Sequence, residues 1–367
     1  MPSDLIVLSH LRWPWVWQRP QHLVSRLARG RRTWFVEEPW PAEVDEPRLC
    51  TEAHGDVTRV WLEVPAQGYL YFDHPTAAAY DELLPELLGE GGKRVVWLYT
   101  ALALDLARRL DPDVLVLDVM DDLASFADAS PQHQMRHHRA LREADLVFTG
   151  GRSLHAGVTA VRTADVHLFP SGVEPEHFAP ARAARPADRP RPVAGYVGVV
   201  DERIDLGLLE GLAAALPDWD VEIVGPTTKV REGDLPQAPN IRWLGGRPYE
   251  ELPSMMAGFD VALMPFARNE ATRSISPTKT LEYLAAGLPV VSTRIADVVA
   301  DYGDVVALAD DPAGFAAHCR RLLDQRGASR PDVDAVLARQ RWDAIARSMD
   351  ALITRHLGAL DHTEATA

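Results

Sequence analysis

Cysteine and long apolar runs are scarce in this sequence, and each scarcity excludes a class of protein. The 367 residues include only two cysteines, Cys50 and Cys319. Small secreted domains that depend on disulfides carry more, so a reducing cytoplasm is the expected compartment. No stretch is apolar over the length of a membrane-spanning helix, and the first residues do not resemble a secretory signal. We therefore expect a cytoplasmic protein.

Basic residues are also few. The chain has 38 Lys and Arg against 53 Asp and Glu, which gives a formal net charge of -15. Such a charge repels nucleic acid phosphates, so we expect no nucleic acid partner. No G-x-G-x-x-G motif follows the first strand of either half, which argues against a dinucleotide oxidoreductase.

What the sequence does contain is an alternation of strand-like and helix-like segments. Short buried runs between helices are typical of parallel strands in an α/β sheet. In the first half these runs are residues 5–8, 33–36, 94–98, 114–117, 145–148 and 166–169. In the second half they are residues 193–199, 221–224, 241–244, 261–264, 290–292 and 305–308. The pattern predicts an α/β fold of two Rossmann-like, doubly wound domains facing a cleft.

A proline-rich segment separates the two halves. Five prolines fall between residues 175 and 192, and proline at this density suppresses regular structure. We therefore predict a first domain over residues 1–172, a linker over 173–192 and a second domain over 193–340. A helix and a disordered tail are expected over 341–367, because the last residues are small and polar.

The segment over residues 276–291, SPTKTLEYLAAGLPVV, is the most informative one. Pro277 suits the start of a helix, and Gly287 suits its end. The free N–H groups at a helix start can bind a phosphate. Lys279 and Glu282, three positions apart, share one face of this helix. They suit a phosphate and a ribose diol respectively, although a surface ion pair would have the same spacing.

This segment resembles the donor-binding helix of GT-B glycosyltransferases, particularly the retaining family-four type. Residues 169–178, FPSGVEPEHF, resemble the motif at which that family's chain crosses between domains. Residues 149–154 resemble its step from a strand through a serine into a helix. The resemblance implies that Glu282 holds the ribose of a nucleotide sugar and that the Ser276 turn offers amides to its diphosphate.

Two departures from the family pattern affect the predicted donor site. Ser274 replaces an earlier glutamate, so contacts to the sugar hydroxyls are expected from Ser274, Asn269 or backbone amides. In the loop over residues 198–205, Arg203 is the only cation available to the diphosphate; the alternative is a solvated loop arginine. The predicted donor-binding residues are Gly198, Arg203, Asn269, Ser274, Ser276, Thr278, Lys279 and Glu282.

Three carboxylates, Asp118, Asp121 and Asp122, follow a buried strand of the first half. Carboxyl ends of strands are where α/β enzymes bind ligands, so we predict a catalytic role for this cluster, with Asp118 or Asp121 as a general base. Asp122 could instead cap the next helix. A Mg²⁺ site is a further alternative, but the resembling enzymes stabilise charge with cations and helix dipoles. We expect no metal and no cofactor.

The loop over residues 10–22, HLRWPWVWQRPQH, interleaves tryptophans with cations. Aromatic rings stack on sugars and arginines bind anions, so His10, Trp15, Trp17 and Arg19 are predicted to bind the acceptor. Packing of the loop onto its domain is the alternative for the tryptophans. The arginines at positions 26, 29, 31 and 32 form a local basic patch that suits an anionic membrane surface, or a solvated helix end.

Together these features predict a glycosyltransferase that moves a sugar from a UDP- or GDP-type donor to a saccharide or lipid-linked hydroxyl acceptor. The run Arg19-Pro20-Gln21-His22 resembles bacterial enzymes of surface-polysaccharide biosynthesis. Peripheral contact with the inner membrane face is a further expectation. The alternatives are a sugar-nucleotide epimerase on the same fold and a catalytically silent GT-B binding partner. The motifs leave the anomeric outcome open.

Overall fold

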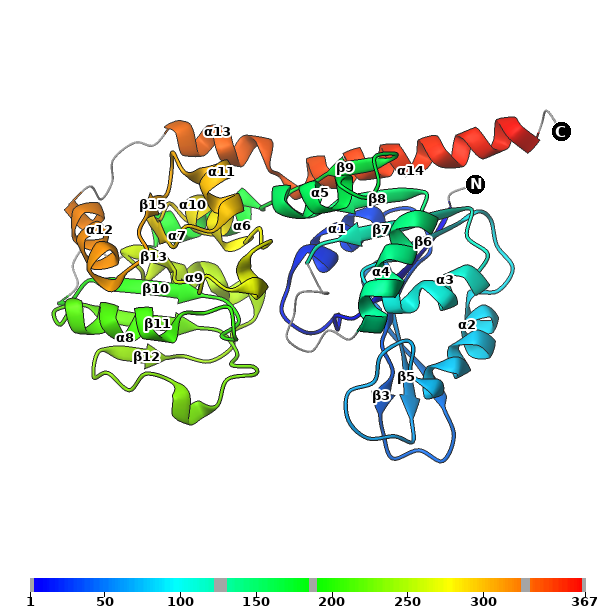
Figure 1. The fold of residues 1–367 in the computed structure, drawn as a ribbon, viewed down its shortest axis with the longest axis horizontal. Coiled ribbons are helices and arrows are strands. Elements are labelled where there is room, and N and C mark those ends of the chain that lie inside the picture. Colours follow the sequence, from blue (N-terminus) through cyan, green and yellow to red (C-terminus); the bar gives the residue numbers. More distant parts are fainter. Residues whose placement is uncertain (1–2, 122–130, 185–189, 325–330, 365–367) are drawn as a thin grey trace. The chain divides into compact units, whose positions relative to one another are not determined.

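The computed structural model describes residues 3–121, 131–184, 190–324 and 331–364, and the chain divides into two compact units. Unit 1 comprises Met1–Phe169 and Asp343–Ala367, and unit 2 comprises Pro170–Trp342. Each unit is built on its own, largely parallel sheet with helices packed on it (Figure 1). The predicted α/β class with two Rossmann-like sheets is confirmed.

Unit 1 has a nine-stranded sheet in the order β3-β5-β2-β1-β6-β7-β8-β9, with β4 paired to β5. Its central strands are continuous apolar runs because parallel strands are buried on both faces. The strands are β1 Asp4–Ser9, β2 Thr33–Glu37, β3 Trp40–Pro41, β4 Arg48–His54, β5 Val57–Val64, β6 Arg94–Leu98, β7 Val114–Val119, β8 Leu146–Thr149 and β9 Val166–Leu168.

Helices cover both faces of this sheet. Alternate strand residues such as Ile6, Leu98 and Leu117 form one core with α2, α3 and α4. On the opposite face, Asp118 bonds Arg19 of α1, so α1 covers that side. The helices are α1 Arg19–Leu27, α2 Tyr80–Leu88, α3 Leu104–Arg109, α4 Pro131–Glu143 and α5 Arg152–Thr159, with short 3-10 turns at Pro75–Ala79 and Ala101–Ala103.

A hairpin in unit 1 was not predicted. Strands β4 and β5 pair antiparallel, from Arg48 opposite Glu63 to His54 opposite Val57. Gly55 sits in the connecting turn with φ 62°, a conformation that glycine adopts without strain. The hairpin extends the sheet at its β3–β5 edge.

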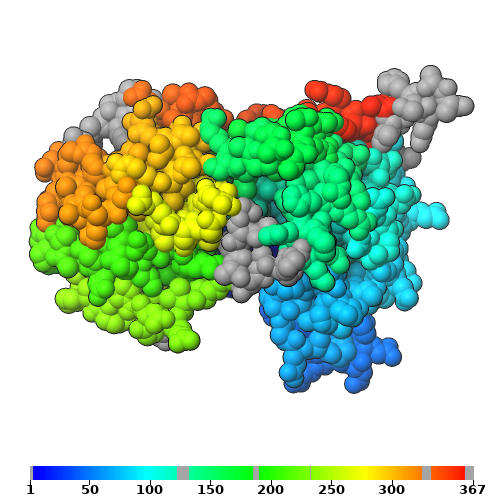
Figure 2. All heavy atoms as spheres, in the orientation of Figure 1, coloured from blue at the N-terminus to red at the C-terminus, as the bar shows by residue number. Residues whose placement is uncertain are grey.

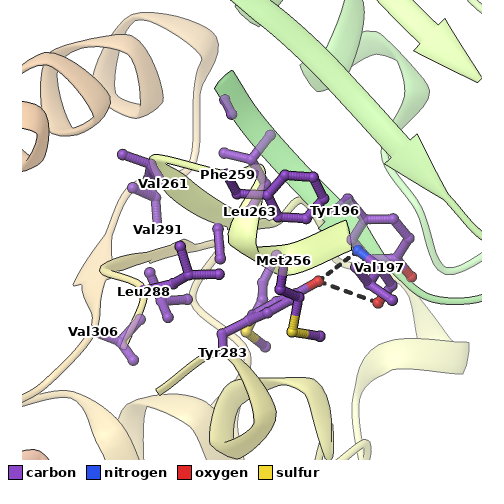
Figure 3. Close-up of a cluster of buried hydrophobic side chains, with 14 of the residues drawn as sticks. Tyr196, Val197, Met256, Phe259, Val261, Leu263, Tyr283, Leu288, Val291 and Val306 are labelled. Atoms are coloured by element: carbon purple, nitrogen blue, oxygen red, sulfur yellow. Dashed lines mark hydrogen bonds between the residues drawn. The ribbon is translucent and has the colours of Figure 1, made fainter. Parts of the chain in front are cut away.

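Unit 2 has a six-stranded sheet in the order β12-β11-β10-β13-β14-β15, and each of its strand pairs is parallel. The strands are β10 Val193–Val197, β11 Asp220–Val224, β12 Ile241–Trp243, β13 Val261–Met264, β14 Val290–Ser292 and β15 Ala307–Leu308. The helices are α8 Leu206–Ala215, α9 Leu252–Ala257, α10 Lys279–Ala285, α11 Ala296–Tyr302, α12 Pro312–Asp324 and α13 Pro331–Arg339. Strands and helices share one buried core, whose centre is drawn in Figure 3.

The segment predicted as a linker is only partly irregular. It contains two short helices, α6 Pro175–Phe178 and α7 Pro180–Ala183, and residues 185–189 lie outside the described residues. Phe178 and Ala181 are buried in the core of unit 2. The prediction of a linker over 173–192 is therefore wrong for its first part. Pro175 and Pro180 each occupy the first turn of a helix, where the missing N–H is tolerated.

The chain returns to unit 1 through its last helix, α14 Trp342–Glu364. Arg26 of α1 bonds Asp343 at 2.8 Å, and the Lys93 ammonium donates to the Leu357 carbonyl oxygen at 2.9 Å. The predicted C-terminal helix is present and runs further than expected, through Glu364. The remainder of the predicted tail, residues 365–367, lies outside the described residues.

Candidate functional site

The predicted donor-binding residues gather at one edge of the unit 2 sheet. Its strand order reverses between β10 and β13, and open α/β sheets bind ligands at the carboxyl ends of the strands at such a point. Gly198 directly follows β10, and Asn269, Ser274, Ser276 and Thr278 lie on the loop between β13 and α10. Arg203 is on the loop after β10, while Lys279 and Glu282 begin α10.

Hydrogen bonds hold the two loops together. The Asp205 amide donates to the Pro265 carbonyl oxygen at 2.8 Å, and the Ala267 amide donates to the Arg203 carbonyl oxygen at 2.8 Å. The Asn269 side chain donates to the Glu202 carbonyl oxygen at 2.9 Å. The loops therefore form one preorganised surface at the reversal point.

Glycine is required where β10 and β11 end. A Cβ on Gly225 would lie 1.8 Å from the Gly198 carbonyl oxygen, and Gly225 has φ 151°. Any larger residue at 225 would force the strand ends apart. The contact keeps the half-buried Gly198 at the carboxyl end of β10, as its predicted role requires.

Lys279 and Glu282 form an ion pair that is not on the surface. The Lys279 ammonium lies 2.6 Å from a Glu282 carboxylate oxygen, and only 14% and 4% of the two side chains are exposed. A surface pair is therefore not what the structure contains. Burying two charges is costly unless other interactions compensate, so the pair is poorly explained by stability alone.

The helix that carries this pair is anchored by Tyr283. The buried Tyr283 hydroxyl accepts from the Val197 amide at 2.7 Å and lies 3.1 Å from the Val197 carbonyl oxygen (Figure 3). This ties α10 to the end of β10. Gly287, with φ 72°, follows the helix, as predicted.

The serine turn before α10 is also fixed. The Ser171 hydroxyl donates to the Ser276 carbonyl oxygen at 3.2 Å. Ser171 belongs to the segment that was likened to a domain-crossing motif, and the chain passes from unit 1 to unit 2 between Phe169 and Pro170. Ser274, Ser276 and Thr278 are half-buried, and Asn269 is exposed.

Arg203 differs from its prediction. Its guanidinium forms bidentate hydrogen bonds with the Asp201 carboxylate, at 2.6–3.0 Å. The same carboxylate accepts from the Arg203 amide at 2.9 Å. This arginine is neither a solvated loop residue nor an uncommitted cation for the diphosphate. The prediction overlooked Asp201, although a carboxylate two positions before an arginine is a visible signal.

In unit 1, Asp118 and Arg19 form a buried ion pair. Arg19 Nε and Nη2 each donate to one Asp118 oxygen at 3.0 Å, and Arg19 Nη1 donates to the Phe169 carbonyl oxygen at 2.8 Å. The two side chains are 3% and 0% exposed. The general-base role predicted for Asp118 and the acceptor contact predicted for Arg19 are therefore corrected, because each group is enclosed and occupied by the other.

The other two aspartates of that cluster are placed differently. Asp121 is half-buried in the loop after β7. Asp122 lies outside the described residues. Tyr99 follows β6 beside Asp118, and burial, followed by the Asp118 charge, raises the pKa of its hydroxyl.

The tryptophan loop is partly packing and partly exposed. Trp13 is buried against Phe35, and the Trp17 indole donates to His22 at 3.1 Å. Trp15 is 51% exposed. Burial lowers the pKa of His10 to about 4, so its ring is neutral at pH 7. Of the predicted acceptor residues, Trp15 thus has the accessibility that its role requires.

Two adjacent glutamates at the end of β2 were missed by the prediction. The buried Glu37 accepts from Arg59 at 2.8 and 3.1 Å and from the Trp13 amide at 2.7 Å. Glu38 is also buried, and one of its oxygens accepts from Tyr69 at 2.8 Å. Burial raises the pKa of Glu38 to about 7. Nothing in the local sequence signals that these carboxyl groups are enclosed.

The predicted basic patch is largely neutralised. Arg26 pairs with Asp343, Arg31 with Asp350 and Arg32 with Asp4. These pairs hold α1 and the start of β1 within unit 1, so they supply little net positive charge to an anionic surface. The prediction of a basic patch is wrong for these three arginines.

Among the residues that the structure describes, no three His, Cys, Asp or Glu side chains are grouped as a metal site requires. None of the helices there has both the length and the apolar character to cross a bilayer.

Comparison with known proteins agrees with this geometry. Residues 191–325 match the family model described as Glycosyl transferases group 1. That range contains all of the predicted donor-binding residues. The similarity to this family model thus lies within unit 2.

A curated relative extends the similarity beyond this domain. A protein of Bacillus subtilis (strain 168), TuaH, is 29% identical over 226 residues, and its name assigns it to the glycosyltransferases of teichuronic acid biosynthesis. The alignment covers 58% of this chain and 57% of TuaH, so the chain spans little more than half the length of that relative.

Solved structures share the fold along nearly the whole chain. A trehalose-6-phosphate structure from E. coli bound with UDP-2-fluoro glucose has a TM-score of 0.69 at 14% identity, covering 97% of this chain and 99% of that one. An α,α-trehalose-phosphate synthase (UDP-forming) from Burkholderia xenovorans has a TM-score of 0.67 at 15% identity, covering 97% and 100%. These likenesses confirm the predicted GT-B fold.

Proposed function

We propose that this protein is a glycosyltransferase that moves a sugar from a UDP- or GDP-type donor to a hydroxyl of a saccharide or lipid-linked acceptor. The observation that carries the proposal is the buried Lys279–Glu282 pair, which lies at the reversal point of the unit 2 sheet. It also lies inside the segment that matches the glycosyl transferases group 1 model.

The pair suits the two ends of a nucleoside diphosphate. The Glu282 carboxylate can accept from two ribose hydroxyls, and the Lys279 ammonium can meet the diphosphate charge that grows as the bond to the sugar breaks. In the free protein each charge compensates the other. Tyr283 and the Ser171–Ser276 bond hold the helix and its preceding turn in place for both roles.

We propose that transfer retains the configuration of the sugar, as in the family-four type that the sequence resembles. The acceptor oxygen bonds to the anomeric carbon as the bond to the diphosphate breaks, and the acceptor proton passes to a leaving phosphate oxygen. The enclosure of Asp118 by Arg19 favours this route, because that carboxylate is not accessible as a base. An inverted anomer, detected by NMR of the product, would exclude it.

Polysaccharide or glycoconjugate biosynthesis is the setting that we propose, in the cytoplasm and without a divalent metal. The teichuronic acid assignment of TuaH and the resemblance to surface-polysaccharide enzymes support it. Contact with an anionic membrane gains little support, because Arg26, Arg31 and Arg32 are paired with aspartates.

A ligand screen followed by product analysis tests the proposal. UDP or GDP should raise the unfolding temperature of the full chain, whereas NAD should not. Incubation with the matching sugar nucleotide and a saccharide panel should release the nucleoside diphosphate in an acceptor-dependent manner. Stabilisation by NAD alone would contradict the proposal. Interconversion of the sugar nucleotide without an acceptor would identify an epimerase, and binding without any turnover a silent partner.

A further inference from the structure

The most exposed aromatic side chains of the described residues lie at one edge of unit 1. They are Trp15, Trp40, Tyr69 and Tyr71, with exposed fractions of 51%, 50%, 61% and 37%. Trp15 lies on the loop after β1, Trp40 begins β3, and Tyr69 and Tyr71 lie on the loop after β5. These strands lie within the first part of the sheet order, β3-β5-β2-β1. We call these four residues the aromatic edge. Such a concentration of exposed aromatic rings is unusual unless the surface binds something.

Two of the rings are fixed by a buried anchor. The Tyr69 hydroxyl donates to Glu38 at 2.8 Å and lies 3.3 Å from the His10 carbonyl oxygen. The Tyr69 and Tyr71 rings contact edge to face, with centroids 5.0 Å apart. Glu38 itself is fully buried. The anchor therefore presents the Tyr69 ring to solvent in a fixed orientation.

Arg12 connects this anchor to Trp40. Its guanidinium lies 4.8 Å from the centre of the Trp40 ring and bonds the carbonyl oxygens of Glu38 and Pro39. Trp15 lies in the same turn, where its amide donates to the Arg12 carbonyl oxygen at 3.2 Å. The four residues of the aromatic edge are thus linked through Arg12, Glu38 and the backbone of the turn that carries Trp15.

Unit 1 has a hollow with a volume of about 520 Å³. It is lined by residues 41–43, which directly follow Trp40 in the sequence, and by residues 65–68, which directly precede Tyr69. The hollow is wide open to solvent. The lining includes the polar side chains of Glu43 and Gln67. Figure 2 shows the segment that carries β3, β4 and β5, in blue, as a lobe at the lower end of unit 1.

We propose that the aromatic edge and its hollow bind the saccharide acceptor, with Trp40 and Tyr69 as stacking faces and Glu38 as the positioning residue of Tyr69. The proposal rests on the proposed function and adds the acceptor's binding site. Rigid aromatic rings with a polar end suit the apolar C–H faces of pyranose rings, and the intervening carboxylates and amides suit their hydroxyls. Packing alone does not account for rings that are half exposed.

Saturation-transfer NMR on the full chain tests the site, with cellobiose, chitobiose and glucuronic acid as probes. At least one probe should bind to the wild type. Trp40→Ala and Tyr69→Ala should each weaken that binding about ten-fold, which is roughly the loss of one stacking contact. Tyr69→Phe keeps the ring and should weaken it less. Leu87→Ala, an exposed apolar side chain on α2, is the matched control and should change nothing.

Calorimetry with UDP and GDP on the same variants separates this proposal from the proposed function. Nucleotide affinity should be unchanged in Trp40→Ala and Tyr69→Ala. Equal saccharide affinity in wild type and both variants would show that the aromatic edge does not bind the saccharide. The absence of binding by every probe at about 10 mM would also contradict the proposal. If saccharide binding follows the variants but neither nucleotide binds the wild type, the saccharide site stands and the transferase proposal fails.

Discussion

At the scale of single residues, Glu38 couples the stability of unit 1 to pH. Burial raises the pKa of Glu38 from 4.5 to about 7, and the nearby Asp73 charge also raises it. Tyr69, Arg12 and the Phe72 amide act in the opposite direction and lower this pKa. In the unfolded chain the group titrates near 4.5. The folded state therefore binds an extra proton between these two pH values. The contribution of Glu38 to the free energy of unfolding is therefore complete below pH 4.5 and is lost as pH rises through 7.

Glu38→Gln should consequently change stability in a pH-dependent manner. At pH 5 the variant should differ from wild type by less than about 1 kcal/mol, because both side chains are neutral in the folded state and only the unfolded wild type is ionised there. At pH 8 it should be more stable than wild type by up to about 3 kcal/mol, because the wild type must then ionise a buried carboxyl group. Denaturant titrations at both pH values measure the difference, with the exposed Glu43→Gln as control. The same difference at pH 5 and pH 8 would be inconsistent with a raised pKa.

The residue scale also separates what the sequence predicts from what it hides. The three-residue spacing of Lys279 and Glu282 correctly placed both on one helical face. Their burial depends on how α10 packs under the two loops, which no local spacing reveals. Asp118 illustrates the same limit. Its partner, Arg19, is 99 positions away, and no local pattern joins two residues at that separation.

At the scale of elements, the Arg19–Asp118 pair joins α1 to β7. We expect Asp118→Asn to destabilise unit 1 by roughly 3–5 kcal/mol, because it leaves the Arg19 charge buried without a counter-charge. Chemical denaturation measures the loss, with the exposed Asp56→Asn as control. The double variant Arg19→Met, Asp118→Leu should recover much of the stability. A fully stable Asp118→Asn with lost turnover would instead restore the catalytic role.

Tyr283 similarly joins α10 to β10. Tyr283→Phe removes the hydroxyl that bonds the Val197 amide and carbonyl, so the cost should be about 1–3 kcal/mol for each buried group left unpaired. Donor affinity should fall with it, because α10 carries Lys279 and Glu282. Tyr196→Phe, which removes one bond to the Val199 carbonyl, should cost less. Equal stability of the two variants would argue against the anchoring role.

Element prediction succeeded where strands are buried on both faces and failed at the edges. Runs such as residues 94–98 and 261–264 match strands residue for residue, because burial on both sides leaves a continuous apolar signal. The β4–β5 hairpin was missed because β4 is mostly exposed and polar. The available signal was the turn dipeptide Gly55-Asp56, which separates the residues of β4 from those of β5. The prolines of α6 and α7 were likewise misread as helix breakers.

At the scale of the whole molecule, the proposed sugar transfer builds up charge on the leaving diphosphate, and this charge must be balanced. We predict that sugar transfer is unchanged in excess EDTA, because Lys279 and the backbone amides of the two loops supply the positive charge. Turnover assays with and without EDTA and Mg²⁺ measure this. Complete loss of activity in EDTA, restored by Mg²⁺, would show that a metal ion takes part.

Calorimetry of the full chain with UDP and GDP measures whether unit 2 binds a nucleoside diphosphate through Glu282. Wild type and the control Glu210→Ala, an exposed site on α8, should bind one of the two nucleotides equally well. Glu282→Ala should bind it roughly ten- to a hundred-fold more weakly, the expected loss for a charge-assisted hydrogen bond. Unchanged affinity in a folded Glu282→Ala protein would contradict the account.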